Sequence, residues 1–213
     1  MDRSEFRCQW VPKENIWQAV DKFTDQYWPE KKVPVNMELI VEDRLGLFID
    51  PIHSLLDEYD VDAWLRVDLS GIVVDHDRYM GERFQNRLRF SLAHEVGHFI
   101  LHKKIFDELP FSTPGEWKDF VLAMPGHEYR SFEWQANEFA GRLLVPCDNL
   151  ADQIIRTKDI IKENGLIEFL KNDPDAVLER VSPLLCKPFG VSEEVVGIRA
   201  KRENLWPPEF DSA

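Results

Sequence analysis

The feature that most constrains this chain is a long helical pattern, between residues 81 and 103, that carries two histidines four positions apart. A helix advances about 100° per residue, so positions i and i+4 stand about 40° and 6 Å apart. His94 and His98 therefore form a polar stripe along one side. Beside them lies a broad apolar face that must pack against a core, made of Leu88, Leu92, Ala93, Val96, Phe99 and Ile100.

Glu95 follows the first histidine directly, in the run His94-Glu95-Val96-Gly97-His98. Two imidazoles at this spacing can converge on one metal ion, and Zn²⁺ is commonly bound by such nitrogen ligands. Glu95 then stands to one side, where it can activate a water at the metal but cannot easily bind the same ion. The run thus predicts a catalytic zinc site. The competing interpretation is an ordinary helix whose polar face happens to carry two histidines and a glutamate.

A catalytic zinc needs a third protein ligand. His102 continues the series, but it lies about 12 Å along the helix from His94, too far to share one ion. A histidine six positions after His98 would also fit a known ligand spacing, but that position is Lys104. The better candidate is Glu133, on a second helix predicted over residues 128–144.

The pattern of this second helix separates its two central glutamates. Glu133 shares a face with Asn137 and with small or apolar residues, so we expect it to point inward. Glu138 should point outward, with Arg142 as a surface partner four residues on. The predicted metal ligands are therefore His94, His98 and Glu133. Asn137 is expected either to orient a ligand or to be an ordinary buried amide.

Composition and charge restrict the class of protein. The 213 residues are 44% apolar and support a real core. No apolar run reaches the roughly 20 residues of a membrane helix, and residues 1–6 carry both charge signs with no apolar stretch behind them. Three cysteines lie far apart and form no close pair. We therefore expect no signal peptide, no disulfide framework and a cytoplasmic location.

The formal net charge of -13 argues against DNA or RNA as the main partner. Such a surface suits a basic protein partner if the charge gathers in a cleft. The alternative is that the charge only keeps the protein soluble.

The chain is predicted to be α+β, with three regions. Residues 1–33 form an aromatic-rich helical extension, residues 34–146 a core, and residues 147–213 a C-terminal helical region. Local patterns predict helices at 16–27, 37–45, 81–103, 128–144, 149–157, 175–185 and 192–203, a short strand at 47–49 stopped by Pro51, and a hairpin of 62–68 with 72–74. Residues 104–127 are predicted to form a long loop with at most one helical turn.

Two blocks of sequence resemble the ImmA/IrrE family of bacterial and phage metallopeptidases. The first runs from Arg89 to His98, as RFSLAHEVGH. The second is Glu133 to Ala140, EWQANEFA, followed by LLVP at 143–146. The resemblance covers residues 34–146 well and the tail more weakly, through Phe189-Gly190-Val191-Ser192. Two features depart from the family pattern, namely Val145, where Met is commoner, and a long proline-containing stretch between His98 and Glu133.

The resemblance implies a mostly helical, zincin-like domain with a small antiparallel sheet and a gluzincin-like ligand set. His94, His98 and Glu133 would bind Zn²⁺ and Glu95 would be the catalytic base. The family's activity implies a zinc metalloendopeptidase that cleaves a helix-turn-helix repressor or antitoxin and so relieves repression. Direct nucleic-acid binding and membrane contact are not expected.

Some roles stay open at this point. The donor that would stabilise the developing oxyanion could be His127, Tyr129 or Tyr79. His53 and His76 lie outside both motif blocks, and we expect them to be surface residues.

Two other functions compete with the enzyme. The fold could be a regulatory module that binds and sequesters a repressor without cutting it, although such a module has no need of Glu95. It could also bind DNA through a recognition helix at 192–203, with Arg199, Lys201 and Arg202 as its basic residues.

Overall fold

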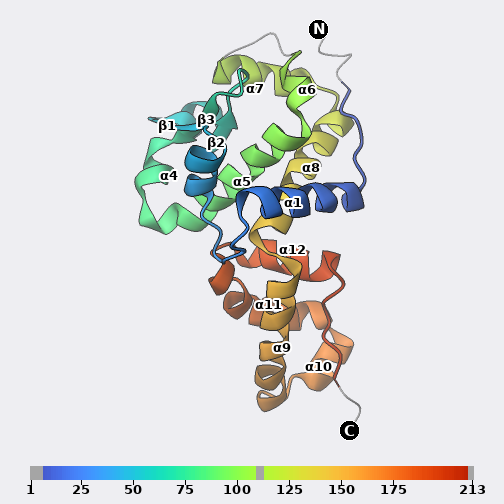
Figure 1. Ribbon diagram of the computed structural model, residues 1–213. Helices are drawn as coiled ribbons and strands as arrows, with labels where there is room; N and C mark the ends of the chain where they lie inside the picture. The colour runs from blue at the N-terminus through green and yellow to red at the C-terminus, as the bar shows by residue number, and fades with distance from the viewer. Residues whose placement is uncertain (1–6, 109–112, 211–213) are drawn as a thin grey trace.

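Two long helices, α5 (Gln85–Leu101) and α8 (Gly126–Leu144), pack against each other at the centre of the molecule (Figure 1). The computed structural model describes residues 7–108 and 113–210. Residues 1–6 of the predicted extension and Pro110 of the predicted loop lie outside the described residues. The predicted α+β class is confirmed, since helices dominate and one small sheet is present.

The first half of the described chain contains the sheet and the short helices around it. Its elements are α1 (Lys13–Tyr27), α2 (Met37–Leu39), the π-helical turn η2 (Ile40–Arg44), β1 (Phe48–Ile52), α3 (Leu55–Tyr59), β2 (Ala63–Leu65), β3 (Gly71–Asp75), α4 (His76–Met80) and η3 (Glu82–Phe84).

The second half is helical. Besides α5 and α8 it contains α6 (Lys103–Phe106), α7 (Pro114–Ala123), α9 (Cys147–Glu163), α10 (Ile167–Asn172), α11 (Pro174–Leu185), η4 (Lys187–Phe189) and α12 (Glu193–Arg202).

The sheet has the order β1-β3-β2. The predicted hairpin is present, because β2 pairs antiparallel with β3. β1 pairs parallel with β3, so the sheet is mixed rather than antiparallel. The chain turns back through α3 before it enters the hairpin, and β1 and β3 therefore run in the same direction. Pro51 lies inside β1 instead of ending it, as an edge strand permits.

The prediction of a long loop over 104–127 was wrong. Residues 103–106 form α6, and α7 covers ten residues of the stretch. Thr113 caps α7, since its hydroxyl accepts from the Glu116 backbone N–H at 3.3 Å while the Glu116 carboxylate accepts from the Thr113 N–H at 3.1 Å. Proline occupies the first position of α7, where its missing N–H costs nothing.

The N-terminal and C-terminal segments cover α8 on the side away from the sheet. α1 packs along α8, and α12 packs on α8 and α11 (Figure 1). The remaining C-terminal helices extend to the lower end of the molecule as drawn. None of the helices in the described part of the chain has both the length and the apolar composition that crossing a bilayer requires.

Candidate metal centre

The close approach of α5 and α8 brings the two sequence motifs together. Gly97 makes this approach possible: a Cβ at that position would lie 3.0 Å from the backbone oxygen of Ala136 and 3.2 Å from the Cβ of Phe139. Because glycine has no side chain, the two helices meet backbone to backbone one turn from Glu133. Of the predicted apolar face of α5, Leu88, Leu92, Ala93 and Val96 are buried, whereas Phe99 and Ile100 are half-buried.

Three side chains with metal-binding atoms converge where the helices meet. The Nε2 atoms of His94 and His98 are 3.0 Å apart. Glu133 Oε2 lies 3.3 Å from Nε2 of His94, and Glu133 Oε1 lies 3.7 Å from Nε2 of His98. Ligands that bind zinc tetrahedrally at about 2.0–2.2 Å stand about 3.3–3.5 Å from one another. The donor set and its spacing therefore fit a zinc ion.

The other ring nitrogen of each histidine has a partner. Asn137 Oδ1 lies 3.0 Å from Nδ1 of His94, so Asn137 does contact a predicted ligand. It is exposed rather than a buried amide. His98 Nδ1 lies 2.9 Å from Nδ1 of His102. Both contacts leave Nε2 of His94 and His98 directed toward Glu133, as a metal site requires.

A chain of hydrogen bonds continues from His102 into the N-terminal segment. His102 Nε2 lies 3.3 Å from Gln135 Oε1, and the Gln135 amide donates to the Gln9 carbonyl at 3.1 Å. One direction of donation satisfies the chain: His98 donates to His102, His102 to Gln135, and Gln135 to the backbone. His102 is thus a buried neighbour of a ligand and not itself one of the convergent donors.

Glu95 is buried beside this group and is held by the sheet. Its Oε2 accepts the backbone N–H of Leu65, the last residue of β2, at 2.8 Å. Burial, and the Glu133 charge, raise the pKa of Glu95 to about 7, although the nearby His94 opposes the shift. In the metal-free protein this carboxyl therefore titrates near neutral pH, as a general base should.

The two histidines titrate in opposite directions in the metal-free protein. Burial lowers the pKa of His94, but the Glu133 carboxylate outweighs it and the pKa rises to about 9. Burial lowers the pKa of His98 well below its ordinary value, and the neighbouring His94 and His102 lower it further. His98 is accordingly neutral, with a lone pair available.

The site opens into a cleft of about 280 Å³. Its floor is formed by His94, Glu95, His98 and Glu133. Its walls come from the loop before β2, from α5 and α8, and from the α6–α7 region; they are Asp60, Val61, Asp62, Ala63, Trp64, Phe90, Ser91, Phe106, Trp117 and Tyr129. None of these described lining residues is a lysine or an arginine.

Of the three residues predicted as possible oxyanion donors, Tyr129 alone is in the cleft lining. Burial, followed by the charges of Glu133 and Glu95, raises its pKa to about 12, so the phenol keeps its proton and can donate. His127 is exposed and lies 3.3 Å from Glu128. Tyr79 is in α4, where burial and then Glu38 and Glu42 raise its pKa.

The prediction that Glu138 points outward was wrong. Glu138 is fully buried, and its carboxylate accepts from Trp17 Nε1 at 2.6 Å, from Arg199 Nη1 at 2.5 Å and from Arg202. Its predicted partner Arg142 instead donates to Glu203 at 2.6 Å. The reason is that α1 and α12 cover the side of α8 opposite α5, so this side faces protein and not solvent.

Sequence reasoning missed Gln135 and the backbone N–H of Leu65. Gln135 lies inside the second motif block, so its position beside Glu133 was a usable signal. The Leu65 N–H contact depends on the sheet edge lying against α5, which no local pattern indicates.

A protein-family model, Peptidase_M78, described as the IrrE N-terminal-like domain, matches residues 84–201. The match covers more than half of the chain. It begins later than the stretch 34–146 and continues through most of α12. No curated protein matches the chain.

Proposed function

Because the chain belongs to the IrrE N-terminal-like family of metallopeptidases, we propose that it is a zinc-dependent endopeptidase that cuts a helix-turn-helix repressor or antitoxin. The observation that carries this proposal is the convergence of His94, His98 and Glu133 beside Glu95 at the floor of one cleft. His94, His98 and Glu133 would hold the zinc through two imidazole nitrogens and a carboxylate.

Zinc, when bound there, would supply a Lewis acid that lowers the pKa of a water toward about 7 and polarises the scissile carbonyl. Glu95 would take the proton from the attacking water and later deliver it to the departing amine. The Leu65 N–H fixes one oxygen of Glu95 for this task. Tyr129, which keeps its proton, would donate a hydrogen bond to the carbonyl oxygen as negative charge develops.

The cleft supports a substrate with basic and apolar side chains. Asp60 lies at its wall together with aromatic residues, whereas Asp62 there is paired with Arg87 and Arg78. Helix-turn-helix proteins are basic because they bind phosphate backbones, so a segment of such a protein complements this lining.

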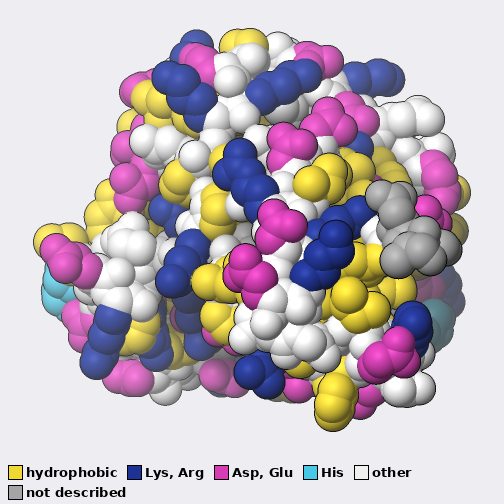
Figure 2. Space-filling view, turned by 90° about the horizontal axis from the view of Figure 1, so that it is seen from below, with side chains coloured by type: hydrophobic (Ala, Val, Ile, Leu, Met, Phe, Trp, Pro, Cys, Tyr) yellow, Lys and Arg dark blue, Asp and Glu magenta, His cyan; other side chains and the backbone are white. Residues whose placement is uncertain are grey.

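The basic residues of α12 give little support to the DNA-binding alternative. Arg199 and Arg202 are committed to Glu138, and Lys201 lies 2.9 Å from Asp175. On the face formed by the C-terminal helices, Figure 2 shows positive and negative side chains interspersed. These contacts favour a structural role for α12.

The test is cleavage of purified helix-turn-helix repressors, and of a proteome-derived peptide library, with products read by mass spectrometry. The zinc-loaded wild type should cut at defined bonds. Glu95→Gln should lose about 10²–10⁴-fold in rate and keep its zinc, whereas Glu133→Gln should lose both. Glu179→Gln, at an exposed position of α11, is the matched control and should behave as wild type.

Two results would contradict the proposal. Cleavage that persists in Glu95→Gln would remove the role of this residue. Tight binding of a repressor by both wild type and Glu95→Gln, with no cleavage by either, would favour the sequestering module.

A further inference from the structure

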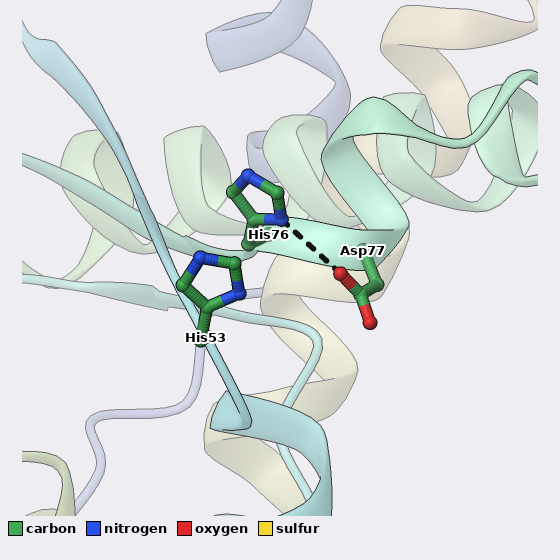
Figure 3. Close-up of side chains that lie close together, drawn as sticks. All are labelled: His53, His76 and Asp77. Carbon is green, nitrogen blue, oxygen red and sulfur yellow. Dashed lines mark hydrogen bonds and ion pairs between the residues drawn. The ribbon is translucent and has the colours of Figure 1, made fainter.

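A second group of metal-binding side chains lies where strands β1 and β3 end, outside the cleft. His53 follows β1, and His76 and Asp77 begin α4 (Figure 3). Each offers one ligand atom, and the three atoms lie within 4.8 Å of one another. None of the three lines the cleft of the first site.

The parallel pairing of β1 with β3 explains why these residues meet. Ile52 pairs with Asp75 in the register of the two strands, so His53 and His76 are the next residues along each chain. Parallel strands deliver their C-terminal ends to the same edge of a sheet. The two imidazole rings accordingly lie with their centroids 3.9 Å apart, although 23 positions separate them in the sequence.

The buried carboxylate of Asp75 holds the backbone on both sides of this group. Its Oδ2 accepts from the Leu56 N–H, just after His53, at 3.1 Å. Its Oδ1 accepts from the N–H groups of Asp77 and Arg78, each at 3.1 Å. Burial of Asp75 opposes ionisation, but these N–H groups outweigh it and lower its pKa. The backbone that carries all three side chains is therefore fixed before any ligand arrives.

From this arrangement we infer that His53, His76 and Asp77 form a second binding site for a divalent transition-metal ion such as Zn²⁺. His76 Nδ1 and Asp77 Oδ1 are already 3.1 Å apart, close to the roughly 3.3 Å between neighbouring ligands of one zinc ion. The His53 ring lies beside them and is exposed, so it can turn inward (Figure 3). Two imidazoles and a carboxylate favour zinc, nickel or copper over magnesium or calcium.

The charges around the site are compatible with a cation. Asp57 and Asp75 line the same hollow as His53 and Asp77. The two guanidinium groups there, of Arg78 and Arg83, lie over the ring of Phe84, at 3.9 Å and 4.4 Å from its centroid. The site is more exposed than the first, so water would complete the coordination and the affinity would be lower.

Metal uptake tests this inference without any measurement of peptidase activity. The chelator-treated full chain is dialysed against graded Zn²⁺, and bound zinc is counted by elemental mass spectrometry. Wild type should take up two equivalents, the second more weakly. His53→Ala and His76→Ala should lose the second equivalent and keep the first, whereas Glu133→Ala should lose the first and keep the second.

His127→Ala removes another exposed imidazole and serves as the matched control, with two equivalents expected. Uptake of a single equivalent by wild type would overturn the inference. So would a second equivalent that survives in the His53→Ala/His76→Ala double variant, because that zinc would be bound elsewhere. Circular dichroism checks that each variant is folded.

Discussion

Two of the three glutamates of helix α8, Glu133 and Glu138, lie five residues apart in opposite electrostatic situations. Glu138 faces α1 and α12 and is surrounded by guanidinium groups and an indole N–H that belong to the protein. Glu133 faces α5, where its neighbours are two imidazole rings, of which His98 is neutral. One carboxylate has its cations supplied by the fold. The other, Glu133, has two histidine neighbours that are themselves predicted ligands, and only a proton on His94 gives it a counter-charge in the metal-free protein.

On this one helix, Glu138 therefore has a structural role, whereas Glu133 has the proposed functional role. A buried carboxylate is tolerated only when it is paired or bound to a metal. Around Glu138 the pairing holds α12 and α1 on α8. Around Glu133, which is partly buried, the protonated His94 supplies the counter-charge in the metal-free protein, and a bound metal ion would take the place of that proton.

The largest expected effect comes from removing the charge of Glu138. Glu138→Gln should destabilise the protein by about 3–5 kcal/mol, because it removes the carboxylate charge shared by Arg199 and Arg202 and leaves the buried Arg199 with Glu203 alone. Urea unfolding would measure the loss. Glu179→Gln is the control, with an expected change within about 0.5 kcal/mol. An unchanged unfolding midpoint for Glu138→Gln would show that the cluster contributes no stability.

The group around Glu133 should make the metal-free protein sensitive to alkaline pH. The folded-state pKa of Glu95 is raised from 4.5 to about 7, so its contribution to stability is lost as the pH rises through 7. The pKa of His94 is raised from 6.5 to about 9, so its contribution is fully present below pH 6.5 and lost through 9. Stability should fall by on the order of 3 kcal/mol between about pH 7 and 9, mainly through His94; below pH 6.5 the lowered pKa values of His98 and His102 act in the opposite direction.

Urea unfolding of chelator-treated protein across this range measures the trend, and Glu95→Gln should show a smaller fall. Zinc should reverse it, since the ligands bind metal in their deprotonated form. A metal-free stability that rises from pH 7 to 9 would contradict the electrostatic description of the site.

The packing that joins the two helices should be less sensitive than the charges. Gly97→Ala would place a Cβ 3.0 Å from the Ala136 carbonyl oxygen, so α5 must move away from α8. We expect a cost of about 1–3 kcal/mol together with weaker zinc binding. Gly165→Ala tests strain elsewhere, at a positive φ of 64° with open space around it, and should leave zinc binding unchanged.

The smallest expected effect is at His102, which orients a ligand without contacting the metal. His102→Ala would remove the partner of His98 Nδ1 and should weaken zinc binding by about 10–100-fold. Competition with a chromophoric chelator would measure the affinity. His102→Gln, which can still accept a hydrogen bond, should recover part of it, and equal losses in both variants would argue against the orienting role.

The part of the site that follows helical geometry could be predicted from the sequence. The i and i+4 spacing fixes His94 and His98, and the inward face of α8 fixes Glu133. The same reasoning failed for Glu138, because a single helix does not show that α1 and α12, more than 50 residues away in the sequence on either side, cover its other face. The parallel pairing of β1 with β3 is also a long-range contact that no local pattern shows. This pairing is what brings His53 and His76 together.

The helix α7 could have been predicted. Thr113 followed three residues later by Glu116 is a capping box, and Pro114 suits the first turn. The prolines between residues 104 and 127 favoured a loop in the sequence-based prediction, because proline usually breaks a helix.

The most direct test of the central claim is the zinc that the full chain retains after extensive dialysis against zinc-free buffer, measured for wild type, Glu133→Ala and His53→Ala. A catalytic site at His94, His98 and Glu133 predicts about one tightly held equivalent in wild type and in His53→Ala, and almost none in Glu133→Ala. Equal retention by wild type and Glu133→Ala, or no retained zinc in wild type, would contradict it.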